Sequence, residues 1–449
     1  MEDTAPIKKI IKDIRWYAPA KIIPGLFGFL AIIIYTRLLS PKEYGLYILA
    51  ITTISIVTAI CFEWLNKSVL RYFEKHKQIG QMTEFISTVV DSLMGIIIVV
   101  LILWYLGVNS LQKYLEPNLV LLLNIGGLVI FTVAGYSFIL YIRQAAQESF
   151  QYAIRSIIRA FVELTIAASF IYFFHMGPKG ILWAMVITAG SILLWDIFSS
   201  RRIWQIKISY FSKKLFKNLL GYGFPLVGLS VASYILVAAD RYMIKYFLTT
   251  DKVGIYSASY SLASEVIQFP MAILLLAAYP IIMATFEKDG EGATSLLLNK
   301  IISLYFIFLM PVIFGITVLS KNIANILLGE SFRSGYTILP WISVGVFCFG
   351  LTQYFYKPFE LKEKTKILSS LVFFAAILNI ILNLFFIPKF GILGAAYATL
   401  ISYLAYFFSS WLISRKIFLW SFPWQTIAKT ILASVVMYLI IYFLSLIHI

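Results

Sequence analysis

Four basic residues lie within or at the edge of long apolar segments, namely Lys21, Arg155, Arg159 and Arg241. In a membrane, such side chains usually face a cavity or an opposite charge. Cations placed in this way can bind a highly charged anionic group through charge-assisted hydrogen bonds. Two alternatives stay open, because Lys21 can extend to the cytoplasmic interface and Arg241 can pair with neighbouring Asp240.

Acidic residues accompany two of these segments. Arg155, Arg159 and Glu163 follow one another at intervals of four, so that Arg159 and Glu163 can satisfy each other as an ion pair. Glu265 lies well inside the apolar segment 255–283, close to the middle of a bilayer. We predict Glu265 as a site of Na⁺ or H⁺ coupling, and the alternative is a hydrogen-bonded structural acid.

The residues required for most enzymes are scattered. The two cysteines, Cys61 and Cys348, lie in apolar runs, and the three histidines are isolated from one another, which argues against a disulfide framework or a zinc cluster. Acidic residues in the predicted external loops are single, and no phosphate-binding loop is present. We therefore expect no catalytic residue, no metal site, no bound cofactor and no enzymatic activity.

The elements that must position these residues are membrane helices. Hydrophobic residues make up 61% of the 449-residue chain and charged residues only 13%, whereas soluble domains have about 25% charged residues. Apolar runs long enough to span a bilayer recur along the chain. They predict an all-α polytopic membrane protein with thirteen helices, within a range of twelve to fourteen, near 16–36, 44–66, 85–106, 119–141, 156–174, 180–199, 222–247, 255–283, 301–320, 339–356, 367–387, 391–413 and 427–447.

The basic residues also predict the orientation of the chain. Lys and Arg are concentrated at the amino terminus and in alternate loops, which places the amino terminus in the cytoplasm. The most basic loop, Arg201–Lys217, lies near the middle of the chain, as expected of a linker between two halves. The formal charge of +16 therefore reflects topology and contact with membrane lipids, and we predict no nucleic-acid partner.

An internal repeat relates the two halves of the chain. Gly45-Leu46-Tyr47 matches Gly254-Ile255-Tyr256 at an offset of 209, and Gly180-Ile181-Leu182 matches Gly391-Ile392-Leu393 at an offset of 211. Two matches at nearly one offset predict two parallel six-helix repeats, an arrangement in which the substrate site lies at the repeat interface. The predicted domains are an N-terminal lobe with its basic linker (1–213), a C-terminal lobe (214–413) and an additional helix (414–449).

The junction after the first predicted helix, Arg37-Leu38-Leu39-Ser40-Pro41-Lys42-Glu43-Tyr44-Gly45-Leu46-Tyr47, resembles that of a known family. This family is the polysaccharide transporter branch of the multidrug/oligosaccharidyl-lipid/polysaccharide (MOP) superfamily, which includes O-antigen (Wzx-type) flippases. Pro225, Asp240-Arg241-Tyr242 and Val253-Gly254-Ile255-Tyr256 resemble the same family around its seventh helix. The resemblance covers roughly residues 10–413. It departs in the helix count, because members usually have twelve or fourteen helices.

The resemblance implies two six-helix lobes around a central cavity. It also implies a flippase that moves a polyprenyl-diphosphate-linked oligosaccharide to the outer leaflet of the plasma (inner) membrane by alternating access, for polysaccharide or O-antigen synthesis. The candidate cavity cations are Lys21, Arg37, Arg155, Arg159 and Arg241. Polysaccharide-assembly proteins are candidate partners. The alternatives are a multidrug or cation antiporter of the same superfamily and a membrane glycosyltransferase or polymerase.

Overall fold

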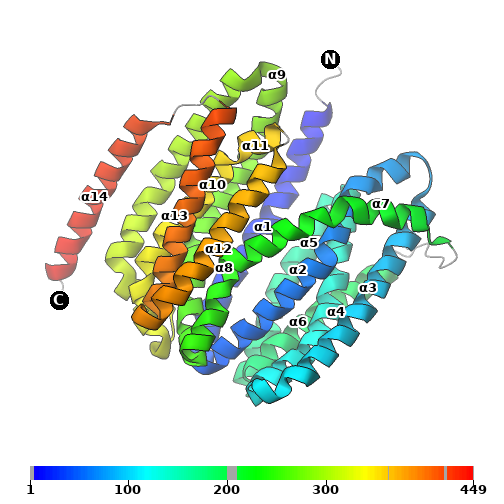
Figure 1. Cartoon of the computed structure of the whole chain (residues 1–449), viewed down its shortest axis with the longest axis horizontal. Coiled ribbons are helices and arrows are strands. Elements are labelled where there is room, and N and C mark those ends of the chain that lie inside the picture. Colours follow the sequence, from blue (N-terminus) through cyan, green and yellow to red (C-terminus); the bar gives the residue numbers. More distant parts are fainter. Residues whose placement is uncertain (1–4, 200–209, 363, 419–421, 448–449) are drawn as a thin grey trace. The chain divides into compact units, whose positions relative to one another are not determined.

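The computed structural model describes residues 5–199, 210–362, 364–418 and 422–447, and these residues are almost entirely helical (Figure 1). The predicted basic linker is therefore described only from residue 210 onward, and Arg201, Arg202 and Lys207 lie outside the described residues. The chain divides into two compact units, one formed by Met1–Leu39 and Glu43–Val231 and the other by Ser40–Lys42 and Ala232–Ile449. The predicted repeats and domain boundaries stay predictions.

Among its described residues, the first unit contains six long helices, one short helix and the first residues of α8 (Pro225–Phe247). The long helices and the short one are α1 (Ala5–Leu38), α2 (Pro41–Gln78), α3 (Met82–Leu111), α4 (Pro117–Ala145), α5 (Ser149–Tyr172), α6 (Pro178–Ser199) and α7 (Lys213–Gly223), with a 3₁₀ turn η1 at Gln112–Tyr114. α1 packs against α5, and α4 and α5 both pack against α6. Tyr136 on α4 packs against Ala189 and Ile192 on α6 in the core between these helices.

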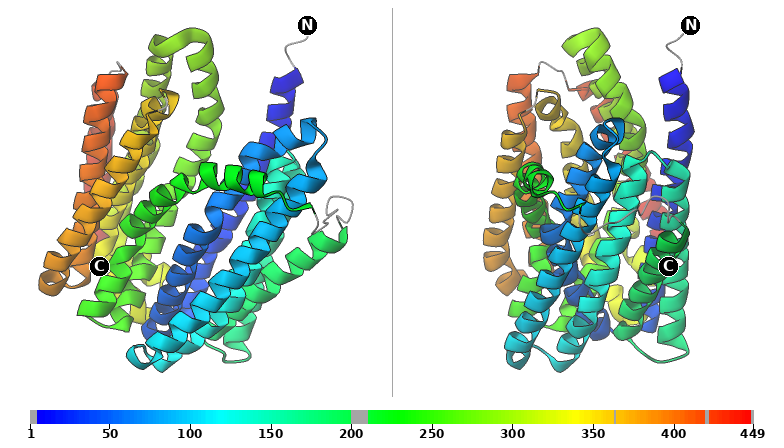
Figure 2. Two further views of the ribbon diagram at one scale, coloured as in Figure 1. Left: turned by 45° about the vertical axis from the view of Figure 1, so that its right-hand side comes forward. Right: turned by 90° about the vertical axis from the view of Figure 1, so that its right-hand side faces the viewer.

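α7 differs from the other helices of the first unit in its direction. It crosses α2 and α3 instead of running along them (Figure 2). The Ser212 hydroxyl caps its first turn by accepting a hydrogen bond from the Leu215 amide. The Ser212 amide donates to Thr88 on α3, and Ser68 on α2 donates to the Leu219 carbonyl. These contacts hold α7 against the ends of α2 and α3.

The second unit contains the remaining helices. They are most of α8 (Pro225–Phe247), α9 (Thr250–Leu327), α10 (Leu339–Phe355), α11 (Lys357–Leu361), α12 (Thr365–Phe390), α13 (Ile392–Ile417) and α14 (Trp424–Ile447), with a 3₁₀ segment η3 at Glu330–Ile338. α10 packs against both α9 and α13, and α14 packs against α9. Gly391 connects α12 to α13 with a φ of 61°, a left-handed conformation that glycine adopts without strain.

The predicted helix count is slightly too high. Within the described residues, eleven helices are long and apolar enough to cross a membrane, compared with the thirteen predicted. One reason is α9, which is counted once although it covers both predicted helices, 255–283 and 301–320. Gly290 departs from helical geometry there, and the two arms of α9 turn back beside each other (Figure 2). The other reason is α5, whose charged residues lower its hydropathy, and counting it as a span would give twelve. The chain is a multi-pass, all-α membrane protein.

A cluster of buried ion pairs joins α4, α5 and α6. The Asp196 carboxylate is completely buried, and its Oδ1 atom lies 2.8 Å from Arg143 Nη2 and 2.5 Å from Arg155 Nη2. Arg143 also pairs with Glu148, which immediately precedes α5. Because both guanidinium groups are buried, the charge of Asp196 compensates charges that water cannot reach.

We predict that Asp196→Asn destabilises the protein by about 3–5 kcal/mol, because two buried arginines lose their shared counter-charge. The matched control is Glu63→Gln, which removes the half-exposed Lys67–Glu63 pair on α2 and should cost no more than about 1 kcal/mol. The measurement is thermal unfolding of both purified variants in detergent. Equal midpoints for Asp196→Asn and the unsubstituted protein would contradict this assignment.

Candidate functional site

A cavity of about 320 Å³ lies within the first unit, between α1, α4 and α5. We call it the α1/α5 cavity. It is lined by Ala20, Lys21 and Pro24 of α1, by Tyr136 of α4 and by Tyr152, Ser156, Arg159, Ala160 and Glu163 of α5. Its volume is at the small end of the range of about 300–1,000 Å³ that is typical of ligand pockets. It contains two of the predicted cations.

The periodicity of α5 explains why this helix contributes most of the lining. Tyr152, Ser156, Arg159 and Glu163 are three or four residues apart and therefore share one face of the helix. Because α1 packs against α5, this polar stripe lies next to a neighbouring membrane helix. The stripe accounts for the low hydropathy of α5, since a polar face can exist at this depth when it lines a cavity.

Within the cavity, one cation is paired and the other is not. Arg159 Nε donates to Glu163 Oε2 at 3.0 Å, which confirms the pairing predicted from their spacing. The Arg159 guanidinium also lies 4.4 Å from the centre of the Tyr136 ring, a distance suited to a cation–π contact. Lys21 is exposed in the cavity and has no ion-pair partner among the described residues. Lys21, Arg159 and Glu163 together give the cavity one net positive charge.

Arg155 is close in sequence to the lining residues Ser156 and Arg159 but does not line the cavity. It lies one turn before Arg159, at the edge of the polar stripe, and is only 1% exposed. Its guanidinium contacts Asp196 and Gln151 and lies 4.7 Å from the centre of the Trp195 ring. The structure therefore places Arg155 in the buried ion-pair cluster.

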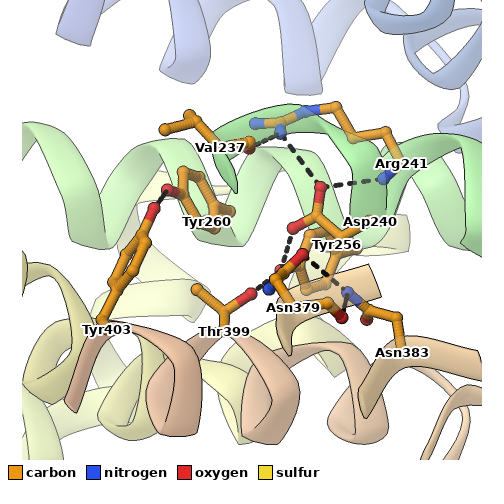
Figure 3. A network of polar contacts seen from close by, with 9 residues as sticks. All are labelled: Val237, Asp240, Arg241, Tyr256, Tyr260, Asn379, Asn383, Thr399 and Tyr403. Carbon is orange, nitrogen blue, oxygen red and sulfur yellow. Dashed lines mark hydrogen bonds and ion pairs between the residues drawn. The ribbon is translucent and has the colours of Figure 1, made fainter. Parts of the chain in front are cut away.

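Arg241 belongs to a polar network in the second unit (Figure 3). Arg241 Nη1 donates to the Val237 carbonyl at 2.5 Å and to Asp240 Oδ1 at 3.2 Å, so the structure contains the Asp240 pair that the sequence left as an alternative. Arg241 is 9% exposed, and its guanidinium lies 5.0 Å from the centre of the Tyr260 ring.

The same network links three helices of the second unit. Tyr256 on α9 donates to Asp240 Oδ2 on α8 at 2.5 Å, and its hydroxyl also lies 3.4 Å from Thr399 on α13. A second link joins the hydroxyls of Tyr260 on α9 and Tyr403 on α13 at 3.0 Å. Tyr256 is the tyrosine of the repeated Gly-Φ-Tyr motif, in which Φ is an apolar residue, so the motif provides a buried donor here.

Asn379 and Asn383 lie one turn apart on α12, beside Tyr256 and Thr399 (Figure 3). Asn383 Nδ2 donates to the backbone and side-chain oxygens of Asn379, each at 2.9 Å. Both residues are buried, and Asn379 Nδ2 and Asn383 Oδ1 have no hydrogen-bond partner within the described residues. The sequence alone indicated only that such a pair can join helices.

The remaining predicted residues lie elsewhere. Arg37 is an exposed residue in the last turn of α1. Glu265 is half-buried on α9 and has no hydrogen-bond or ion-pair partner among the described residues. In the part of the chain that the structure describes, no group of three or more His, Cys, Asp or Glu side chains is arranged to hold a metal ion.

Sequence reasoning missed Tyr136, Tyr152 and Ser156 as lining residues of the cavity. The sequence contained a signal for Tyr152 and Ser156, because their spacing places them on the same face of α5 as Arg159. Tyr136 comes from α4, and no pattern within α4 distinguishes it from the other aromatic residues of a membrane helix.

Comparisons with known proteins agree with this fold. The chain is 25% identical over 405 residues to a putative O-antigen transporter of Shigella flexneri, with 86% of this chain and 93% of that protein covered. A lipid II flippase MurJ structure in an inward closed conformation superposes with a TM-score of 0.76 at 17% identity, over 94% of this chain and 91% of that one. An inward-facing multidrug resistance MATE transporter of the MOP superfamily gives 0.74 at 13% identity, over 89% and 97%. At these identities, the two structures establish the fold alone.

A family model described as "Polysaccharide biosynthesis protein" matches residues 10–286, which is more than half of the chain and includes the first unit with its cavity. The match also includes the junction at residues 37–47 and the segment around Asp240, and it confirms the resemblance found there. The chain belongs to the polysaccharide biosynthesis protein family.

Proposed function

We propose that the chain is a flippase that moves a polyprenyl-diphosphate-linked oligosaccharide from the cytoplasmic to the outer leaflet of the plasma membrane by alternating access. The observation that carries this proposal is the α1/α5 cavity, which combines an unpaired lysine with sugar-compatible tyrosine and serine side chains inside a membrane helix bundle. Family membership and the O-antigen transporter relative support a glycan as cargo.

The chemistry of the cargo matches the charges of the cavity. A lipid-linked glycan is anionic, and Lys21 and Arg159 can contact its negative groups through charge-assisted hydrogen bonds. A flippase changes the leaflet that its substrate occupies and leaves covalent bonds intact, so the mechanism requires no nucleophile or acid–base pair. For ion coupling, we retain Glu265 as the candidate residue, because it is a half-buried carboxylate without a charged partner in the described chain.

A multidrug antiporter is the second candidate function, because a MATE structure shares the fold. Such a transporter for cationic drugs would need an acidic or neutral pocket. The α1/α5 cavity instead contains two cations and one carboxylate. This excess of positive charge favours an anionic cargo.

We predict that Lys21→Ala slows flipping about ten- to a hundredfold in vesicles containing a lipid-linked glycan, because one charge-assisted contact of about 1.5–3 kcal/mol is lost. Lys21→Arg should retain more activity. Lys67→Ala is the control, because Lys67 pairs with Glu63 on α2 outside the cavity. Leaflet-specific cleavage of the glycan measures the rate, and mass spectrometry should show an unchanged substrate. Normal flipping by Lys21→Ala at equal protein density would exclude Lys21 from the site.

We also predict the orientation of the chain in the membrane. Lys77 lies in the last turn of α2, and Lys113 lies beyond the far end of α3, at the opposite end of the first unit. Lys214 lies on α7, which contacts the first turns of α3, and Asp251 lies in the first turn of α9. Single cysteines at positions 77, 113, 214 and 251 replace the native residues in a variant without Cys61 and Cys348. An impermeant thiol reagent should label intact cells only at positions 113 and 251. External labelling of position 214 would reverse the orientation.

A further inference from the structure

The charge balance of the α1/α5 cavity limits what can bind there. Lys21 and Arg159 contribute two positive charges, and Glu163 contributes one negative charge. The diphosphate diester of a lipid carrier has two negative charges and would lie beside the Glu163 carboxylate. Like charges at about 4 Å repel by roughly 4 kcal/mol per pair at the effective dielectric constant of a protein surface. A group with a single negative charge experiences about half of this repulsion.

The hydrogen-bonding capacity of Glu163 also disfavours a diphosphate as the ligand of this cavity. An ionised carboxylate such as Glu163 only accepts hydrogen bonds. A diphosphate diester also only accepts, so it has no donor for Glu163. Arg159 uses its Nε atom for this carboxylate, which leaves Glu163 with further acceptor capacity toward a ligand. Sugar hydroxyls donate as well as accept, and they therefore complement Glu163.

The remaining lining fits a sugar ring. Tyr152 and Tyr136 contribute aromatic rings, whose apolar bodies suit the C–H groups of a pyranose. Tyr152 is held in place by an edge-to-face contact with Tyr17, with ring centres 5.4 Å apart. The volume of about 320 Å³ accommodates a single sugar unit.

We propose that the α1/α5 cavity is a subsite for a sugar that carries one carboxylate, such as a uronic acid unit of the transported glycan. Lys21 binds the sugar carboxylate, and the Glu163 carboxylate of the Arg159–Glu163 pair accepts hydrogen bonds from ring hydroxyls. This assignment rests on the proposed function and specifies which part of the substrate occupies the cavity. A neutral sugar would leave Lys21 without a counter-charge, and the diphosphate would contact residues outside this cavity.

The test measures protection of a cysteine placed in the cavity. Ala160→Cys introduces a thiol at the lining in a variant with Cys61→Ser and Cys348→Ser. The purified protein is alkylated with N-ethylmaleimide, which is uncharged, in the presence of methyl glucuronide, methyl glucoside, dimethyl diphosphate or acetate. We expect methyl glucuronide to halve the alkylation rate at a concentration at least about tenfold lower than any other probe, because it alone makes the charge-assisted contact and the hydroxyl contacts.

Two substitutions test the separate contributions. Lys21→Met should raise the half-protecting concentration of methyl glucuronide about tenfold and leave that of methyl glucoside unchanged. Glu163→Gln should reduce the preference for methyl glucuronide over dimethyl diphosphate about tenfold, because the repelling charge is gone. Glu63→Gln is the matched control, since it removes an i,i+4 ion pair on α2 and should keep the original ranking. If one variant fails to fold, the ranking of the four probes on the parent protein still decides the question.

Three results would overturn the proposal: protection by dimethyl diphosphate at lower concentration than by methyl glucuronide, equal protection by methyl glucoside, or no protection by methyl glucuronide. The flipping assay distinguishes these failures from failure of the proposed function. A protein that flips a lipid-linked glycan but shows no preference for the glucuronide is a flippase without this subsite. A protein that binds the glucuronide but flips no lipid-linked glycan contains the proposed sugar-acid site and has another function.

Discussion

An unpaired charge in the hydrocarbon region of a membrane is unfavourable, and this constraint accounts for the buried ion pairs of both units. In the first unit, the fully buried Asp196 contacts Arg143 and Arg155. In the second unit, Asp240 is 2% exposed, pairs with Arg241 on the same helix and accepts a hydrogen bond from Tyr256 of α9. Lipid provides no hydrophobic driving force between apolar helices, so these polar contacts and close packing hold neighbouring helices together.

On α5, the need to pair buried charges is met differently by Arg155, which lies in the ion-pair cluster, and by Arg159, which lines the cavity. Arg155 and Arg159 are one turn apart, but Arg155 turns toward Asp196 whereas Arg159 lies over Tyr136 and pairs with Glu163. The ion-pair cluster joins α5 to α4 and α6, and α1 lies next to the adjacent stripe. The buried cluster thus orients the face of α5 that lines the cavity, and rigid support of this kind is what a selective binding site requires.

In the proposed subsite, ligands are selected both by an attractive group, Lys21, and by a group that disfavours other ligands, Glu163. The unpaired cation of this subsite, Lys21, attracts an anion, whereas Glu163 disfavours ligands that carry several negative charges or no hydrogen-bond donor. A pocket built only from cations would bind any phosphate. The combination of one free lysine with an acceptor instead favours a ligand that presents both a charge and hydroxyl groups.

Composition and local spacing determined that the chain is a helical membrane protein and that Arg159 pairs with Glu163, because apolar runs must form helices in lipid and residues four apart share a helix face. They did not determine how the chain turns within α9, where the non-helical conformation of Gly290 separates two arms that correspond to the predicted spans 255–283 and 301–320 (Figure 2). Only the tertiary structure decided that Arg155 is buried against Asp196 while Lys21 remains free in the cavity. Such partners come from other helices, and the sequence of one helix carries no information about which neighbour covers each of its faces.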